Sequence, residues 1–199
     1  MTVTLTHFGF AKRTSMDTYK AQNRGGRGIT GQTTREEDFV EHLFGCNTHD
    51  EIMFFTNMGR VFRMKCYRIP EAGRTAKGTA IVNLLNLKEG EKVTTLFPLW
   101  EEGKYLNLIT KAGIIKKTPI EEFDNIRKGG MIAQNLRDGD ELIAAIMTDG
   151  NDEIIVGTKK GKSIRFSEED VRPMGRSATG VKAITLEEND SVVGAEKVR

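Results

Sequence analysis

Four segments of the chain repeat one order of residues. Each begins with an apolar run that ends in Thr, and these threonines are Thr6, Thr56, Thr110 and Thr158. In every repeat a Gly follows three residues later, a Lys or Arg stands four residues after that Gly, and a second Gly comes 17 or 19 residues after the first. Because these positions recur in register at spacings of 50, 54 and 48 residues, a repeated structural unit is indicated.

Each unit is expected to contain four short strands. The T-x-x-G sequence is typical of a hairpin turn, where Gly supplies a positive φ. An acidic turn then joins the third and fourth strands, as at 137–140. Four strands in about 40–50 residues are the signature of propeller-like radial repeats. We therefore predict one all-β domain over 1–199, a propeller-like disc of four-stranded blades near 1–50, 51–104, 105–152 and 153–199.

Composition indicates a globular, cytoplasmic protein without a membrane segment. Hydrophobic residues make up 38% of the chain and charged residues 29%. The longest apolar run found, 142–147, is too short to cross a bilayer, and the first ten residues have no signal-peptide pattern. Cys46 and Cys66 stand apart from any C-x-x-C motif and are expected to be free thiols in a reducing compartment.

The positive charges are concentrated between the two glycines of each repeat. These four stretches, called excursions below, hold 19 of the 30 Lys and Arg residues and 8 of the 28 acidic residues. Their net charge is +11, while the remainder of the chain carries −9. Equivalent segments of a radial fold lie at equivalent places around the axis, so a basic belt along one edge is expected. Such a belt is typical of a protein that follows a phosphate backbone.

The basic side chains of the excursions are therefore the predicted contacts to DNA. An alternative is that they lie on solvated loops and pair with nearby acids, which is strongest in the third and fourth repeats because of the acids at 121–124 and 168–170. The predicted rim residues are Lys12, Arg13, Lys20, Arg60, Arg63, Lys65, Arg68, Arg74, Lys77, Lys116, Lys117, Arg127, Lys128, Lys162, Arg165, Arg172 and Arg176.

Two local motifs resemble nucleotide-binding sequences, but the residues around each motif argue against a nucleotide site. Residues 157–163 resemble a phosphate-binding P-loop, but the glycine spacing is one residue short and the segment falls on a repeat hairpin. Residues 26–31 match G-x-G-x-x-G, but the stretch before them is too polar for a buried parallel strand. A helix is possible locally, because 34–37 resembles a capping box and Phe39, Val40, Leu43 and Phe44 have helical spacing. The repeat register instead predicts a strand over 38–44. No cofactor, metal site or catalytic residue is predicted, since His7, His42 and His49 lack ligand spacing.

The segment 22–28, QNRGGRG, resembles the box motif Q-[RK]-R-G-G-[RK]-G of the C-terminal domain of DNA gyrase A. The repeat order resembles the blades of that domain over nearly the whole chain. One position departs from the motif, because Asn23 stands where Arg or Lys is usual, which removes one charge. The residues that match the box and would contact DNA are Gln22, Arg24, Gly25, Gly26, Arg27 and Gly28.

The resemblance implies a β-pinwheel, in which neighbouring blades exchange strands, and a non-catalytic domain that wraps double-stranded DNA around its rim. The remainder of gyrase A, which contains the catalytic tyrosine, and through it gyrase B are the implied partners. The location implied is the cytoplasm, in association with the nucleoid. The disc of this family usually has six blades, so four repeats indicate a shortened or a naturally shorter domain, and Met1 resembles an engineered start.

Two other functions stay open. One is that of the related topoisomerase IV protein, whose C-terminal domain binds DNA without strong wrapping. The other is a propeller-like module that binds protein. The box motif favours the gyrase-type domain over both, because it is degenerate or missing in topoisomerase IV.

Overall fold

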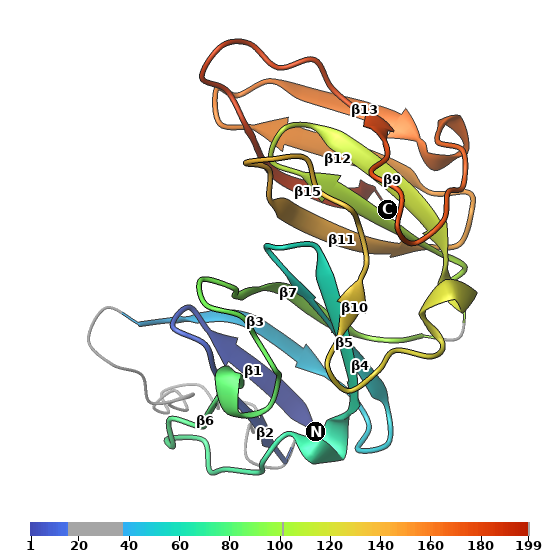
Figure 1. Ribbon diagram of the computed structural model, residues 1–199. Coiled ribbons are helices and arrows are strands. Elements are labelled where there is room, and N and C mark those ends of the chain that lie inside the picture. The colour runs from blue at the N-terminus through green and yellow to red at the C-terminus, as the bar shows by residue number, and fades with distance from the viewer. Residues whose placement is uncertain (16–37, 101, 199) are drawn as a thin grey trace, which may run out of the picture. The chain divides into compact units, whose positions relative to one another are not determined.

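The computed structural model describes residues 1–15, 38–100 and 102–198 of the 199-residue chain. Within these residues the chain consists of β-strands and short 3-10 turns, which confirms the all-β prediction (Figure 1). The chain divides into two compact units, the first of 1–53, 63–88 and 96–99, the second of 54–62, 89–95 and 100–199. No described helix has the length and apolar character that a bilayer-spanning segment needs.

The first two strands of every repeat form the predicted hairpin. The hairpin strands are β1 (Thr2–Thr6) and β2 (Phe10–Thr14), β4 (Glu51–Thr56) and β5 (Arg60–Lys65), β8 (Tyr105–Thr110) and β9 (Ile114–Pro119), and β12 (Glu153–Thr158) and β13 (Ser163–Ser167). The turn is fixed by the two recurring residues: in the third repeat Gly113, at φ +88°, donates its N–H to Thr110 O at 3.0 Å. The Thr110 hydroxyl oxygen accepts from Ile114 N at 3.2 Å, and the same bond recurs in the other three repeats.

The closing strand of each repeat lies beside the first strand of the same repeat. These strands are β3 (Val40–Gly45), β7 (Val93–Pro98), β11 (Leu142–Thr148) and β15 (Val192–Val198). The first strand thus has its hairpin partner on one side and the closing strand on the other. The strand predicted from the repeat register over 38–44 is thereby confirmed against the local helix pattern, because β3 pairs with β1 from Val40 to Gly45 with one register shift. Likewise, the segment that resembles a P-loop forms the β12–β13 hairpin.

The remaining strand of the second, third and fourth repeats pairs with the preceding repeat and not with its own. These strands have two residues each: β6 (Thr79–Ala80) pairs with β2, β10 (Met131–Ile132) with β5, and β14 (Val181–Lys182) with β9. The strand exchange implied by the family resemblance is therefore present between these repeats. The sheet orders are β3-β1-β2-β6, β10-β5-β4-β7 and β11-β8-β9-β14, and among the described residues the fourth sheet is β13-β12-β15.

The second Gly of the repeat permits this exchange. Gly180 has φ +112°, and a Cβ atom there would lie 2.3 Å from Ile115 O, so only Gly lets the two backbones approach this closely. The same residue position has φ +97° at Gly78 and +80° at Gly130. The exchanged strand therefore begins at a point that no residue with a side chain fits without strain.

In the second, third and fourth excursions a short 3-10 turn follows the second hairpin strand. The turns are η2 (Cys66–Arg68), η4 (Ile120–Phe123) and η5 (Glu168–Asp170), and a further turn, η3 (Ile81–Asn83), follows β6. Ile69, Phe123 and Val171, which stand six residues after the recurring Lys or Arg of their repeats, are at most 5% exposed. Because these side chains are buried, the chain between them and the second Gly is held at both ends.

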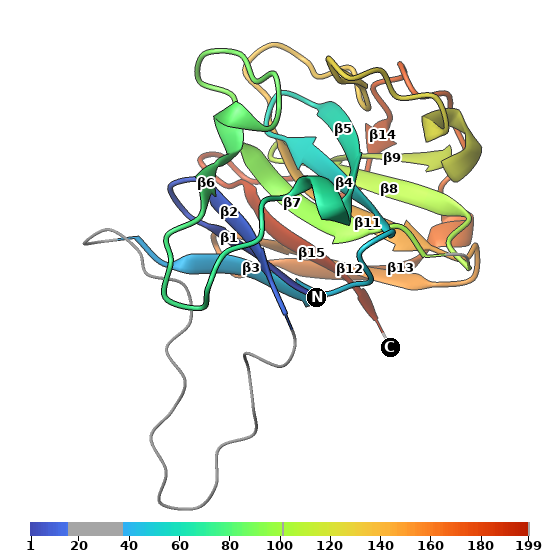
Figure 2. The same cartoon turned by 90° about the horizontal axis from the view of Figure 1, so that it is seen from below.

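In the second unit, the third and fourth repeats share one hydrophobic core. Strands β8, β9 and β11 belong to one sheet and β12 and β15 to the next, as Figure 2 shows. The core residues are Ile109, Ile115, Ala144, Ile146, Ile154, Val156, Val171, Ile184 and Val192. One face of the fourth sheet is thereby buried against the third.

Candidate functional site

The predicted box residues lie outside the described part of the chain. Gln22, Arg24, Gly25, Gly26, Arg27 and Gly28 all fall in 16–37, as does Lys20 of the predicted rim. Their contact with DNA stays a prediction.

The basic residue that recurs four positions after the first Gly faces a carboxylate in every repeat. The pairs are Arg13 Nη1–Glu71 Oε2 at 3.5 Å, Arg63 Nε–Glu51 Oε2 at 3.3 Å, Lys117 Nζ–Glu168 Oε1 at 3.5 Å, and Arg165 with Glu153. Two of these acids, Glu51 and Glu153, begin the first strand of the repeat. This basic position therefore has an intramolecular role, in agreement with the alternative that the excursion charges pair with nearby acids.

The pair of Lys117 and Glu168 is buried, and both side chains make further hydrogen bonds. The Glu168 side chain has no exposed surface, and its carboxylate accepts from Thr148 Oγ1 at 2.8 Å and from Gly150 N and Asp152 N at 3.2 and 2.8 Å. Lys117 Nζ also donates to Glu168 O at 3.1 Å. Hydrogen bonds to the remaining polar atoms offset the desolvation of a buried ion pair, and the Glu168 carboxylate accepts three of them here.

Glu168 also belongs to a group of three acids, with Asp149 and Asp152, whose oxygens lie within 4.8 Å of one another. Asp152 Oδ2 accepts from Asp149 N at 2.9 Å, and Asp149 Oδ1 accepts from Asn151 N at 2.8 Å. Each of the three carboxylates already accepts a backbone N–H from the turn between β11 and β12. We therefore infer that the group stabilises this turn.

Lys12 and Lys116, three positions after the first Gly, are fully buried. Burial lowers the pKa of Lys12, and it lowers the pKa of Lys116 to about 7, with Glu122 opposing that shift and Arg176 adding to it. Both ammonium groups donate to backbone carbonyls inside the protein. Neither lysine, although in the predicted rim, presents its charge at the surface.

A signal for this placement was available in the sequence. The same repeat position holds Phe62 in the second repeat and Ile164 in the fourth. Side chains alternate between the two faces of a strand, so Lys12 and Arg13 cannot both point to the same side. A comparison across the repeats would thus have placed Lys12 and Lys116 at a core position.

Five further predicted rim residues bind other parts of the protein. The contacts are Arg60 Nη1 to Glu91 Oε1 at 2.7 Å, Lys65 Nζ to Glu51 Oε1 at 3.2 Å, Lys77 Nζ at 4.0 Å from the Phe10 ring centroid, Lys162 Nζ to Thr185 O at 3.0 Å, and Arg176 Nη1 to Glu122 O at 3.4 Å. Charge on an excursion is therefore only partly available to an external ligand.

A smaller set of cations is exposed and lies on the described excursions. These residues, called the excursion cations, are Arg68, Arg74, Arg127, Lys128 and Arg172. None of them makes an ion pair with another residue in the described ranges. Exposed, unpaired guanidinium and ammonium groups are available to bind phosphate.

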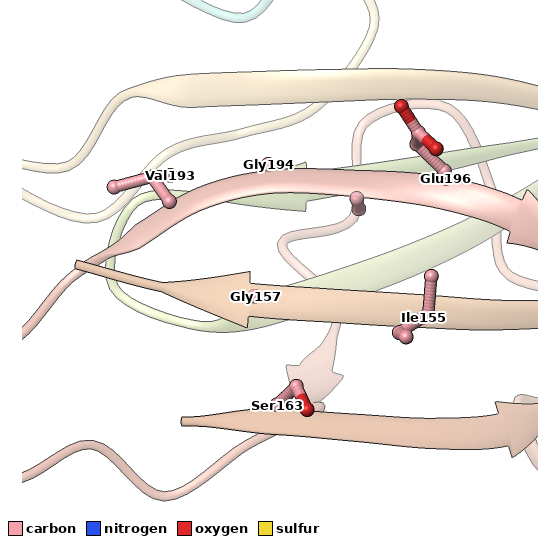
Figure 3. Close-up of a pocket in the computed structure, with 7 residues that line it drawn as sticks. Ile155, Gly157, Ser163, Val193, Gly194 and Glu196 are labelled. Atoms are coloured by element: carbon pink, nitrogen blue, oxygen red, sulfur yellow. The ribbon is translucent and has the colours of Figure 1, made fainter. Parts of the chain in front are cut away.

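A separate pocket of about 320 Å³ lies on the face of the fourth sheet, over β12, β13 and β15 (Figure 3). It is lined by Ile155, Gly157, Ser163, Val193, Gly194, Ala195 and Glu196. Glu196 is the one charged side chain among these lining residues. The pocket therefore has no group that would attract a phosphate.

Comparison with known proteins gives consistent matches along the chain. A family model described as DNA gyrase C-terminal domain, beta-propeller, matches residues 2–47, 50–99, 104–149 and 152–199. The DNA gyrase A protein of Halalkalibacterium halodurans is 55% identical over 185 residues, which are 92% of this chain and 22% of that protein. The corresponding protein of Clostridium acetobutylicum is 54% identical over 182 residues, 90% of this chain and 22% of that protein.

Two solved structures resemble the whole chain. The C-terminal domain of a DNA topoisomerase IV has a TM-score of 0.81 at 25% identity, and this chain covers 61% of it. A DNA gyrase A C-terminal domain has a TM-score of 0.76 at 30% identity, with 64% covered. Both comparisons include 100% of this chain. The propeller-like β-pinwheel predicted above is therefore confirmed as the fold.

Proposed function

The chain belongs to the DNA gyrase C-terminal domain family, and on this basis we propose that it binds and wraps double-stranded DNA without an active site of its own. Binding is largely independent of sequence, because phosphate contacts fix position without reading bases. The observation behind the proposal is the set of excursion cations, which are exposed and make no ion pair with a described residue.

The excursion cations act by replacing counterions along the DNA backbone. Each neutralised phosphate releases condensed cations, which makes affinity strong at low salt and steeply salt-dependent. Bending 20–30 base pairs by 40–90° costs about 1–6 kcal/mol, and successive contacts from several repeats offset that cost. The basic belt and the box contacts predicted from the sequence are part of this proposal.

The proposed partners follow from the same family membership. The chain spans about 22% of the curated relatives it matches, so the remainder of a gyrase A protein, and gyrase B through it, are proposed partners. The DNA wrapped here would be presented to that core for negative supercoiling. The cytoplasm, in association with the nucleoid, is the proposed location.

A titration of labelled duplex DNA at about 50 and 200 mM salt tests the proposal. Binding should weaken steeply with salt, and a triple Ala variant at Arg68, Arg74 and Arg172 should bind less tightly. Its log–log salt slope should be smaller by about 0.9 for each phosphate that it no longer neutralises. A matched triple Ala variant at Lys92, Lys111 and Lys159 removes the same charge from exposed positions outside the excursions. If both variants lose the same affinity, or if binding does not depend on salt, the proposal fails.

A topoisomerase IV-type function, with DNA binding but weak wrapping, is the second candidate. The higher TM-score of the topoisomerase IV domain, 0.81 against 0.76, favours it, while the gyrase A relatives at 54–55% identity favour the gyrase type. Fluorescence transfer between the ends of a bound duplex separates the two. A large decrease in end-to-end distance supports wrapping, and an unchanged distance at saturation supports the second candidate.

A further inference from the structure

The two buried lysines bind the excursion of the following repeat. Lys12 Nζ donates to Gly73 O at 2.8 Å, Arg74 O at 2.7 Å and Ala76 O at 3.0 Å. A buried ammonium group is costly unless its protons all have acceptors, and these three carbonyls supply them. The loop at 73–78 is therefore held by its carbonyl oxygens, which face Lys12.

The same arrangement recurs in the second half of the chain. Lys116 Nζ donates to Gly175 O at 3.3 Å, to Arg176 O and to Ala133 O. The two loops also share a sequence, since 73–78 reads GRTAKG and 175–180 reads GRSATG. In each loop the Ala N–H closes a turn onto the first Gly carbonyl, at 3.0 and 3.1 Å.

The second repeat lacks the lysine, and the excursion that follows it lacks the loop sequence. Phe62 occupies the lysine position, and a Cβ at Gly130 would lie 2.7 Å from its ring. The third excursion, whose Gly130 packs against Phe62, ends in NIRKGG at 125–130 and lacks the G-R-x-A-x-G sequence. The buried lysine and the G-R-x-A-x-G loop thus occur together twice and are absent together once. This indicates that the lysine and the loop form one structural unit.

The inward carbonyls leave backbone N–H groups on the outer side of the loop. The peptide bonds of the described chain are trans, so each N–H points away from the preceding carbonyl oxygen. Because Gly73 O and Arg74 O face Lys12, the N–H groups of Arg74 and Thr75 face away from it. Neither N–H binds another described residue, and both residues are exposed. Consecutive outward N–H groups form a concavity suited to anions.

The equivalent loop of the fourth repeat already binds an anionic group. Arg176 N donates to Glu122 Oε1 at 3.2 Å, and Arg176 Nη1 donates to Glu122 O at 3.4 Å. Arg176 is the residue equivalent to Arg74. The Glu122 carboxylate therefore stands where a phosphate oxygen would bind, and it shows that the N–H groups of such a loop can bind an anion.

We propose that the loop 73–78 is a phosphate-binding site for the DNA backbone, built by Lys12 as a positioning residue, and that Glu122 occupies the equivalent site of the fourth repeat. This inference depends on the proposed DNA-binding function. Arg74 supplies the side-chain charge, and the N–H groups of Arg74 and Thr75 supply the directional hydrogen bonds.

Backbone amide NMR of the labelled chain during titration with a duplex of about 30 base pairs tests the site. The amide signals of Arg74 and Thr75 should shift on binding, and Lys12→Met should abolish these two shifts while the signals of the fourth-repeat hairpin stay in place. Duplex binding with no response at Arg74 and Thr75 overturns this inference alone. Absence of any duplex binding overturns both this inference and the proposed function.

A gain-of-function variant tests the same idea without removing a buried group. Glu122→Ala should open the fourth-repeat loop, extend the amide shifts to Arg176 and Ser177, and raise duplex affinity about tenfold. Glu121→Ala, an exposed neighbour with the same charge change and no hydrogen bond to the loop, should produce a smaller gain. Equal gains in the two variants contradict the proposal.

Inorganic phosphate alone, added at the concentration of duplex phosphates, distinguishes a nucleic-acid site from a site for free anions. Little response to phosphate and a strong response to duplex support the proposal. A response to phosphate without one to duplex overturns it.

Discussion

The carboxylate of Glu91 has no exposed surface, and its Oε1 lies 2.7 Å from Arg60 Nη1. Glu91 Oε2 accepts from the hairpin hydroxyl Thr56 Oγ1 at 2.7 Å, and Arg60 also donates to Gly129 O in the next excursion. Arg60 therefore connects a hairpin, an acidic turn and a neighbouring excursion, so its charge stabilises the fold although the sequence placed it in the rim.

Removal of this arginine should affect stability more than DNA binding. Arg60→Met removes the guanidinium from the buried Glu91 carboxylate, which should lower the free energy of unfolding by about 3–5 kcal/mol. Arg165→Met breaks a pair whose side chains are 57% and 47% exposed, and should change it by about 1 kcal/mol or less. Urea unfolding of both variants provides the comparison, and equal losses would contradict the assignment.

Gly180 should tolerate no side chain. In Gly180→Ala the new Cβ meets Ile115 O at 2.3 Å at a φ of +112°, so the free energy of unfolding should fall by about 3 kcal/mol or more. Gly139→Ala is the matched control, since its φ is +77° but no atom lies within 4 Å of the new Cβ. It should cost about 1–2 kcal/mol, from backbone strain alone. Thermal unfolding of the two variants measures the difference.

Lys116 should make stability depend on pH. Burial lowers its pKa to about 7 from a usual 10.5, with Arg176 and Glu122 as the charged groups nearby. Between these pH values the unfolded chain binds more protons, so the free energy of unfolding should rise with pH, by at most about 1.4 kcal/mol per pH unit. This contribution is absent below pH 7 and complete near pH 10.5. Urea unfolding at about pH 7, 8 and 9 should show a shallower slope in Lys116→Met, and parallel curves would refute the assignment.

Cys46 should be almost inert in the folded chain. Burial, together with a hydrogen bond to Cys66 at an Sγ–Sγ distance of 3.0 Å, raises the pKa of the Cys46 thiol to about 12. Because the thiolate is the reactive form, alkylation at about pH 8 should be about a thousandfold slower than in urea. Mass spectrometry after timed iodoacetamide treatment measures the rate, with Cys66→Ala as the variant in which that hydrogen bond is removed.

The hairpins could be predicted from the sequence because the residues that form each turn are close together in the chain. Thr and Gly three residues apart determine a hairpin through bonds that both residues make themselves, as Thr110 and Gly113 do. The strand exchange could not be derived from the pattern in the same way, since the partner of Val181 is Ile115, far away in the chain. Net charge also cannot distinguish a solvated arginine such as Arg74 from a buried lysine such as Lys12, and only alignment of the repeats on one another separates the two.

Strand exchange and the buried lysines together limit which repeats can be added or removed without loss of the fold. Each of the first three sheets takes its two-residue strand from the following repeat. If one repeat were duplicated or deleted, that strand would have to come from a different repeat. A cut between the first and second repeats would also leave Lys12 without its three acceptors, and a cut between the third and fourth would remove two of the three acceptors of Lys116. The number of repeats should therefore change with the least loss of stability when two repeats are gained or lost together. The suitable junction is one without the buried lysine, such as that between the second and third repeats, where Phe62 packs against Gly130.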